Sequence, residues 1–217
     1  MSRALFNTTT SSSESTAEPE IDAGTEQTRR TLLLGALATT ACLGCSTQVH
    51  AGEDPPGADE RPQKGDLLVF SEGDREGKPI AAADLSVGGP PVHAWPKDPK
   101  TSVVRSASRL NEILIIRLDP AEFDEQTKAR AVDGIVAYSA ICSHAGCPVT
   151  AWMKSDVGDK EVLKCMCHNS EYDPRAGAQV VFGPAPRRLA ALPLALADGS
   201  LSVAGNFLGK VGGVQPG

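Results

Sequence analysis

The 217-residue chain has few aromatic side chains, with two Trp, two Tyr and five Phe making up 4% of the sequence. It also lacks an uncharged apolar run of the roughly 20 residues that a membrane-spanning helix needs. Lys and Arg form no long run, and the formal net charge is −6. Because phosphate binding needs a concentrated cationic face, these absences argue against nucleic acid as a partner and against a multi-span membrane protein.

Turn-forming residues are abundant instead, with 21 Gly and 16 Pro, and 41% of the residues are hydrophobic. This composition favours a turn-rich, all-β domain with a real core. Short apolar or β-branched segments bounded by turn residues predict strands at residues 66–70, 101–105, 112–118, 134–139, 179–182, 192–196 and 201–204. Asp198-Gly199 predicts a hairpin turn between the last two strands.

One helix is predicted, because Asp119 can cap it, Pro120 suits its first position and Glu122 completes a capping-box-like start. We expect this helix to run to about residue 131. The chain is therefore expected to form an antiparallel β-sandwich with one short helix and an inserted segment at about residues 141–187.

The N-terminal region is typical of a targeting sequence rather than of a folded domain. Residues 1–27 are rich in Ser, Thr and Glu and are expected to be disordered. Arg29-Arg30 precede a short apolar run, so residues 28–51 resemble a twin-arginine export signal. The signal could be cleaved after Ala51, kept as a single N-terminal membrane anchor, or lipidated at Cys45. Residues 52–65 are expected to be a linker, and export predicts a periplasmic location, soluble or anchored to the inner membrane.

Cysteine and histidine gather in two short segments of the remaining chain: Cys142, His144 and Cys147 in the first, and Cys165, Cys167 and His168 in the second. Three interpretations are open. A structural Cys₂His₂ zinc site fits the ligand count but leaves an extra cysteine in each segment without a role. Two structural disulfides leave both histidines without one. A [2Fe–2S] cluster with two cysteines on one iron and two histidines on the other uses a Cys and a His from each segment.

The spacing of these residues resembles the two motifs of the Rieske iron–sulfur family, Cys142-x-His144-x-Gly146-Cys147 and Cys165-x-Cys167-His168-x-Ser170-x-Tyr172-Asp173. The resemblance implies a Rieske fold over residues 66–217. It also implies that Cys142 and Cys165 bind one iron of a single [2Fe–2S] cluster, and that His144 and His168 bind the other.

The same resemblance implies roles for residues around the cluster. Cys147 and Cys167 would form a disulfide that ties the two loops together, as an oxidising compartment permits. The segment that would cover the cluster, like the family's proline loop, is Gly183, Pro184, Ala185 and Pro186. Ser170 would donate a hydrogen bond to a bridging sulfide and Tyr172 one to the Cys142 thiolate. Both bonds favour reduction and predict a high-potential centre.

The chain departs from the common pattern at three positions. Met166 and Asn169 stand where the second motif commonly has Pro and Gly, and Asn tolerates the left-handed backbone that Gly would supply. Ala145 stands where quinol-oxidising family members commonly have Leu, which weakens a quinol-oxidase interpretation.

We therefore expect an exported electron-transfer protein rather than a stand-alone catalyst. The first hypothesis is the small iron–sulfur subunit of a periplasmic oxidoreductase resembling arsenite oxidase, paired with a large molybdenum subunit. The second is the Rieske subunit of a quinol:cytochrome c reductase, with cytochrome b or c as redox partner. A zinc-stabilised binding module is the alternative of another class. Outside the motifs, His93 is expected to be structural, and Arg187-Arg188 is either a solvated pair or a docking point for an acidic partner.

Overall fold

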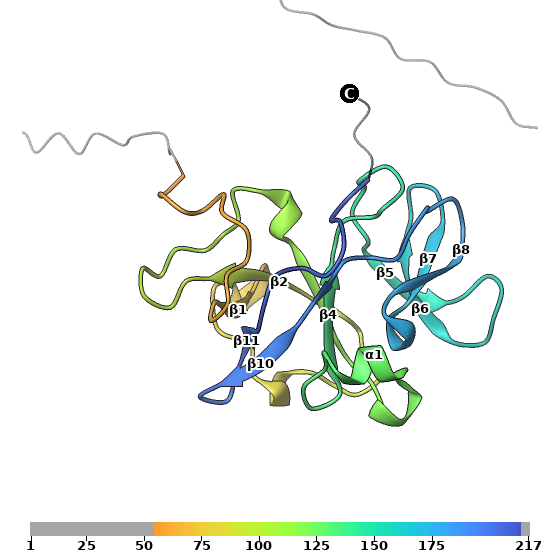
Figure 1. The fold of residues 1–217 in the computed structure, drawn as a ribbon, viewed down its shortest axis with the longest axis horizontal. Coiled ribbons are helices and arrows are strands. Elements are labelled where there is room, and N and C mark those ends of the chain that lie inside the picture. The colour runs from red at the N-terminus through yellow and green to blue at the C-terminus, as the bar shows by residue number, and fades with distance from the viewer. Residues whose placement is uncertain (1–53, 214–217) are drawn as a thin grey trace, which may run out of the picture. The chain divides into compact units, whose positions relative to one another are not determined.

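The computed structural model describes residues 54–213, which form a mostly β structure (Figure 1). The strands are β1 (Leu67–Phe70), β2 (Val92–Lys97), β3 (Ile113–Arg117), β4 (Ile135–Ser139), β5 (Ala151–Lys154), β6 (Glu161–Cys165), β7 (Ser170–Asp173), β8 (Gln179–Phe182), β9 (Ala191–Leu192), β10 (Leu194–Ala197) and β11 (Ser200–Val203). The helical segments are α1 (Glu125–Lys128) and the 3₁₀ turns Gly73–Arg75, Ala82–Asp84, Arg109–Asn111, Pro120–Glu122 and Pro174–Ala176. The predicted all-β class is confirmed. The expected disordered region and export signal lie outside the described residues.

Seven strands form one antiparallel base sheet in the order β10-β11-β1-β2-β3-β4-β9. Its two edge strands, β9 and β10, are separated in the chain by Pro193 alone. The sheet must therefore curl until its edges meet at this proline, so that it is nearly closed. The hairpin between β10 and β11 turns at Asp198 and Gly199 with φ values of 49° and 80°, as their sequence predicts.

Strands β3 and β4 are buried on both faces. Successive side chains of a strand point to opposite faces, and the unbroken apolar run of β3 supplies both. Ile113 and Ile115 pack into a core on one face of the base sheet. Leu114 and Ile116 pack into a second core, which also contains Cys142, Cys165 and Tyr172. The predicted cluster ligands therefore rest on the base sheet through a shared apolar layer.

A second antiparallel sheet, β5-β6-β7-β8, is inserted between β4 and β9 and lies beside the base sheet on the right of Figure 1. Its two chain connections leave the base sheet side by side, because β4 pairs with β9 through Ala137–Leu192 and Tyr138–Ala191. This is the predicted insertion, and both cysteine–histidine segments belong to it.

The predicted helix is shorter than expected. Asp119 caps a 3₁₀ turn by accepting a hydrogen bond from Ala121 N–H, but the backbone becomes extended at Phe123, with ψ 143°. Phe123 thereby packs into the second core. A second cap, from Asp124 to Thr127 N–H, starts α1, which ends at Lys128.

Two other segments differ from expectation. Residues 101–105 form no strand, because Ser102 adopts φ 62° and its N–H donates to Asp98 O in a turn. Part of the segment expected to be a linker, residues 52–65, is packed against the domain. Ala58 is buried, and the buried Arg105 donates hydrogen bonds to Gly57 O and to the Glu60 carboxylate. No helix in residues 54–213 has the length and apolar character that crossing a membrane requires.

Candidate metal centre

The first cysteine–histidine loop follows β4 and is closed by its own backbone. Cys142 N–H donates to Cys147 O at 2.8 Å, and Gly146 N–H donates to Cys142 O at 3.1 Å. Gly146 takes the left-handed φ of 72° that this tight turn requires. The loop therefore holds Cys142 and Cys147 at its neck and carries His144 and Ala145 beyond them.

The second loop is the turn between β6 and β7, whose strands pair through Cys165 and Ser170. Asn169 completes this turn with φ 58°, which confirms that Asn takes the left-handed position commonly given to Gly. Residues Met166 to Asn169 are exposed, whereas Cys165 and Ser170 are buried. The strand ends thus bury one cysteine and one serine and leave His168 at the surface.

The cysteines of the two loops meet. The Sγ atoms of Cys147, Cys165 and Cys167 all lie within 4.8 Å of one another, and the described cysteines form no disulfide in the structure. Burial raises the pKa of the Cys165 thiol to about 12, and the neighbouring Cys142 adds to the effect. Such a thiol becomes a thiolate only when a cation balances it, which is the setting of a metal ligand.

The two histidines also meet. The ring centroids of His144 and His168 are 4.7 Å apart, and the rings stand edge to face at 85°. Nδ1 of His144 is buried and has no hydrogen-bond partner among the described residues. A buried ring nitrogen without a partner is costly unless it binds something.

The donor set fits a Rieske-type [2Fe–2S] cluster. Each loop brings one buried cysteine and one histidine to the same place, which is the Cys₂His₂ requirement of that cluster. Ser170 provides a second observation, because its Oγ is buried without a partner among the described residues. A hydroxyl in that state has a proton to donate to an acceptor such as a sulfide.

Hydrogen bonds converge on Cys142 from the protein side. The Tyr172 hydroxyl lies 3.1 Å from Cys142 Sγ, and His144 N–H donates to the same sulfur at 3.5 Å. Burial raises the pKa of Tyr172 above its usual range, so the hydroxyl keeps its proton and can donate it. Donors that face a ligand sulfur stabilise added electron density there and raise the reduction potential.

Ser143, which sequence analysis missed, fixes the tyrosine. Its N–H donates to the Tyr172 oxygen at 3.2 Å, and its hydroxyl donates to Arg187 O. Ser143 thereby links the first loop to the segment that follows residues 183–186. Its position between Cys142 and His144 was the only signal in the sequence.

The segment expected to cover the cluster lies against the second loop. A Cβ atom placed on Gly183 would lie 2.6 Å from both Asn169 O and Ser170 Cα, and Gly183 has φ 90°. Only glycine allows this close approach. Ala185 packs against the second core, whereas Pro184 and Pro186 are exposed.

Comparison with known proteins agrees with this geometry. A family model described as the Rieske [2Fe–2S] domain matches residues 111–193. The cytochrome bc1 complex Rieske iron–sulfur subunit of Streptomyces lividans is 32% identical over 158 residues, which cover 69% of this chain and 85% of that protein. The chain belongs to the Rieske iron–sulfur family. Membership implies one Rieske-type [2Fe–2S] cluster as the cofactor.

Other proteins match this chain over part of their own length. The bc1 Rieske subunit of Mycobacterium tuberculosis is 29% identical over 164 residues, covering 67% of this chain but 37% of that protein. A putative respiratory nitrate reductase subunit Rieske from Haloferax mediterranei is 32% identical over 149 residues, covering 66% of this chain and 62% of that protein. A solved hyperthermophilic respiratory Complex III is 21% identical with a TM-score of 0.35, over 57% of this chain and 71% of that one.

Behind the second loop, the Rieske protein carries a buried ion pair that sequence analysis also missed. Lys164 and Glu171 face each other across β6 and β7, one residue from Cys165 and Ser170, with Nζ 3.0 Å from Oε1. Hydrogen bonding to Asp156, then to Glu171, raises the pKa of Lys164. Glu171 is fully buried and accepts hydrogen bonds from the Ser155 hydroxyl and Asp156 N–H. Nothing in the local sequence pattern indicates that these two charged residues are buried and paired.

His93 and Arg187, which lie outside the two motifs, both form hydrogen-bond contacts within the protein. His93 Nδ1 lies 2.7 Å from Glu112 Oε1, a contact within the base that supports the structural role predicted for it. Arg187 is partly buried, and its guanidinium donates to Gly212 O, so this arginine is not freely solvated, whereas Arg188 is exposed.

Proposed function

We propose that this Rieske protein transfers single electrons as the iron–sulfur subunit of an exported respiratory oxidoreductase. In this proposal Cys142 and Cys165 bind one iron, and His144 and His168 bind the other. The observation that carries the assignment is the meeting of the two loops, with the His144 and His168 rings 4.7 Å apart and the Tyr172 hydroxyl 3.1 Å from Cys142 Sγ. The cluster, when bound, accepts and gives up one electron at a time.

The protein residues would set how readily that electron is accepted. Two neutral imidazoles in place of two thiolates lower the negative charge around the iron, and the potential rises. Tyr172 and the backbone N–H of His144 donate to Cys142 and act in the same direction. Ser170, with its hydroxyl proton unused by the described residues, would donate to a bridging sulfide. The partly exposed His144 and exposed His168 would give partner proteins access to the centre.

Two kinds of complex are candidates for the partner. Relatives named as bc1 Rieske subunits support a quinol:cytochrome c reductase, in which cytochromes b and c would be the redox partners. Ala145 favours a different complex, similar to arsenite oxidase, in which a large molybdenum subunit is the partner. Ala145 is exposed at the tip of the first loop, and its methyl group offers little of the apolar surface that the usual Leu would bring to a quinol site.

The compartment and the loop disulfide belong to the same proposal. Arg29-Arg30 and the following apolar run support export in the folded state to the periplasm, with or without retention of an inner-membrane anchor. Cys147 and Cys167 have Sγ atoms within 4.8 Å, which supports a disulfide between the two loops in that oxidising compartment. Mass spectrometry of non-reduced tryptic peptides from the exported protein should find these two cysteines linked and the other two unlinked.

The deciding experiment is purification of the C-terminally tagged chain from periplasm and membranes separately, followed by iron, sulfide and partner analysis. Two irons and two acid-labile sulfides per chain, with an axial or rhombic Rieske EPR signal, are expected. Zinc in place of iron would refute electron transfer and leave a zinc-stabilised binding module. A co-purifying b-type cytochrome selects the quinol:cytochrome c reductase, and a molybdenum subunit selects the arsenite oxidase-like complex.

A further inference from the structure

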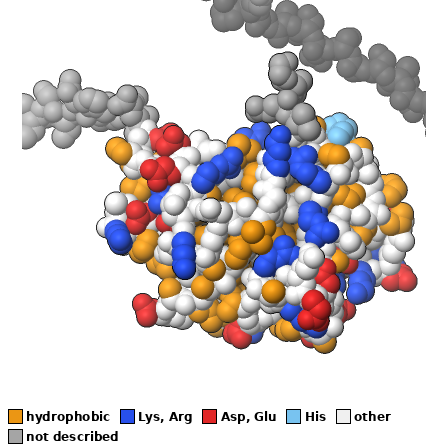
Figure 2. Space-filling view, in the orientation of Figure 1, with side chains coloured by type: hydrophobic (Ala, Val, Ile, Leu, Met, Phe, Trp, Pro, Cys, Tyr) orange, Lys and Arg blue, Asp and Glu red, His pale blue; other side chains and the backbone are white. Residues whose placement is uncertain are grey.

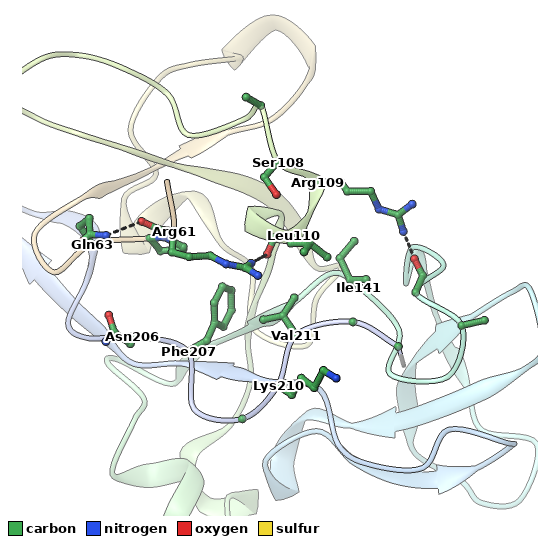
Figure 3. A pocket seen from close by; sticks show the side chains of 17 residues that line it. Arg61, Gln63, Ser108, Arg109, Leu110, Ile141, Asn206, Phe207, Lys210 and Val211 are labelled. Carbon is green, nitrogen blue, oxygen red and sulfur yellow. Dashed lines mark hydrogen bonds between the residues drawn. The ribbon is translucent and has the colours of Figure 1, made fainter. Parts of the chain in front are cut away.

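A cavity of about 1140 Å³ lies beside the first cysteine–histidine loop (Figure 3). Three separate segments form its walls: residues 61–63, residues 107–110 and residues 206–213. Ala145 and Gly146 of the first loop close one side. None of the roles assigned to the cluster ligands, the proline loop or the hydrogen-bonding serines and tyrosine uses this space.

The cavity is cationic although the chain is acidic overall. Arg61, Arg109 and Lys210 line it, and no carboxylate is among its lining residues. All three side chains are exposed, and none forms an ion pair with a carboxylate within residues 54–213. Figure 2 shows Lys and Arg side chains over the middle and upper part of one face, with acidic side chains toward its left and lower edges. The cavity therefore presents unneutralised positive charge to an incoming group.

The arrangement of these charges suits an extended ligand. Figure 3 shows Arg61, Arg109 and Lys210 on different walls rather than converging on one point. The volume slightly exceeds the range of about 300–1,000 Å³ found for pockets that hold drug-sized molecules, so a single oxyanion would fill little of it. Between the cations, Leu110 and Phe207 supply apolar surface. An acidic peptide segment with interspersed apolar side chains matches both features.

Residues that line the cavity contact the loop that carries the predicted iron ligand His144. Arg109 donates a hydrogen bond to Gly146 O. A Cβ atom placed on Gly213 would lie 2.6 Å from His144 O, so the C-terminal wall of the cavity touches the backbone of the ligand itself. A segment bound in the cavity would therefore contact the same loop that carries His144.

We propose that this cavity, framed by Arg61, Arg109 and Lys210, binds an acidic segment of the protein that exchanges electrons with the cluster. The inference rests on the proposed electron-transfer function and names the chemistry of its partner. The acidic segment would align the partner beside His144 and His168. Electrostatic complementarity of this kind raises association rates and falls off with salt.

The test uses the full-length, cluster-loaded protein and a fluorescent decapeptide that carries four glutamates and two leucines. Fluorescence anisotropy should show binding that weakens as salt increases, and at least tenfold weaker binding to the Arg61→Glu/Lys210→Glu variant. Lys210→Glu alone, which removes no hydrogen bond recorded for residues 54–213, should weaken binding in the same direction. The control Lys78→Glu/Lys100→Glu changes the net charge equally with exposed lysines outside the cavity and should bind as the wild type does.

A second readout is the reduction potential with and without saturating peptide. A negative segment beside the first loop favours the more positive, oxidised cluster, and tenfold tighter binding to that state lowers the potential by about 59 mV. Equal loss of peptide binding in both double variants would overturn the proposal, because the attraction would then be non-specific. Displacement of the peptide by equimolar inorganic phosphate would also overturn it, in favour of a small-anion site. Peptide binding by protein loaded with zinc would leave the cavity assignment standing while the electron-transfer proposal failed.

Discussion

The hydroxyl of Tyr172 lies 3.1 Å from Sγ of Cys142; Tyr172 belongs to β7 of the inserted sheet, and Cys142 lies in the loop that follows β4 of the base sheet. Both side chains are buried in the core that β3 and β4 support. The contact therefore joins the first loop directly to β7 of the inserted sheet. It makes the tyrosine a reporter of whether the first loop is in place.

Replacing Tyr172 with Phe should lower the reduction potential while leaving the cluster bound. A hydrogen bond worth about 1 kcal/mol more in the reduced state corresponds to about 40 mV for one electron. Tyr138→Phe is the matched control, because Tyr138 is equally buried but donates to Pro174 O at 2.6 Å rather than to a sulfur. A redox titration should therefore give a lower reduction potential for Tyr172→Phe and an unchanged potential for Tyr138→Phe.

Adding Ser170→Ala to the Tyr172 variant should lower the potential further. The Ser170 hydroxyl is buried and has no partner within the described residues, which leaves the cluster as its acceptor. An unchanged potential in the double variant would contradict the roles assigned to both hydroxyls.

Gly183→Ala should disturb the centre as well as destabilise the fold. A new Cβ would lie 2.6 Å from Asn169 O and Ser170 Cα, and overpacking together with left-handed strain costs about 3 kcal/mol. Gly199→Ala is the control, since Gly199 has a similar φ of 80° but no atom within 4 Å of the added Cβ. It should cost about 1 kcal/mol from backbone strain alone. Thermal unfolding should rank the two variants, and only Gly183→Ala should alter the EPR spectrum.

Removing only Lys164 from the Lys164–Glu171 ion pair should destabilise the protein more than replacing both residues of the pair. Lys164→Met leaves the fully buried Glu171 carboxylate without its cation, whereas Lys164→Met/Glu171→Leu removes both charges. We expect the single variant to lose several degrees in melting temperature and the double variant to recover part of that loss. Circular dichroism of the cluster during heating would measure both, and a double variant less stable than the single one would contradict the pair's role.

The ion pair between Glu122 and Arg175 predicts a pH-dependent stability. Arg175 Nε donates to Glu122 at 2.6 Å, and this hydrogen bond holds the pKa of the carboxyl below its usual range. A lowered pKa in the folded state stabilises the protein above the unfolded value of about 4.3 and is lost as the pH falls through the folded pKa. Because Glu122 is partly exposed, we expect the ion pair to contribute about 1 kcal/mol or less to the free energy of unfolding.

Glu122→Gln should therefore lower the melting temperature at pH 7, and the difference from wild type should shrink as the pH approaches 3. Glu125→Gln provides the comparison, because Glu125 is almost fully exposed and its only ion-pair partner among residues 54–213 is Lys128 in the same helix. A difference that persists unchanged at pH 3 would show that lost packing, not lost charge, explains the effect.

The strands of the base sheet were largely predictable because their sequences are continuous apolar runs. Ile113–Arg117 and Ile135–Ser139 fall within the predicted ranges. β2 was not among the predicted strands, because Pro96 interrupts its pattern and suggests a loop or an edge strand. In the structure β2 lies between β1 and β3, Pro96 O accepts a hydrogen bond from Arg105 N–H, and the strand pairs with β1 across this position. A proline excludes a donor from the ladder but still contributes an acceptor.

Three of the four strands in the inserted sheet, β5, β6 and β7, were missed, and for β6 and β7 the reason is different. Lys164 and Glu171 occupy buried strand positions, so β6 and β7 lack the apolar alternation that identifies a strand. Their burial comes from pairing with each other, which no local pattern records. The cysteine and histidine motifs were visible because metal chemistry restricts residue type and spacing more tightly than packing does.

The cavity beside the first loop was invisible in the sequence for the same physical reason. Arg61, Arg109 and Lys210 are far apart in the chain and line one cavity only because the sheet curls and residues 206–213 return across it. Each is an ordinary surface cation by itself. Their common role emerges only from tertiary structure.

The side-by-side departure of the inserted sheet from β4 and β9 makes it a module. Because Ala137 pairs with Leu192 at its base, the base sheet holds the two ends of the insertion together whatever lies between them. Changing the length of an exposed turn such as residues 157–160 alters loop entropy only slowly and leaves this junction untouched. Redox centres with different partner preferences could therefore be exchanged on one unchanged base by recombination at two adjacent points.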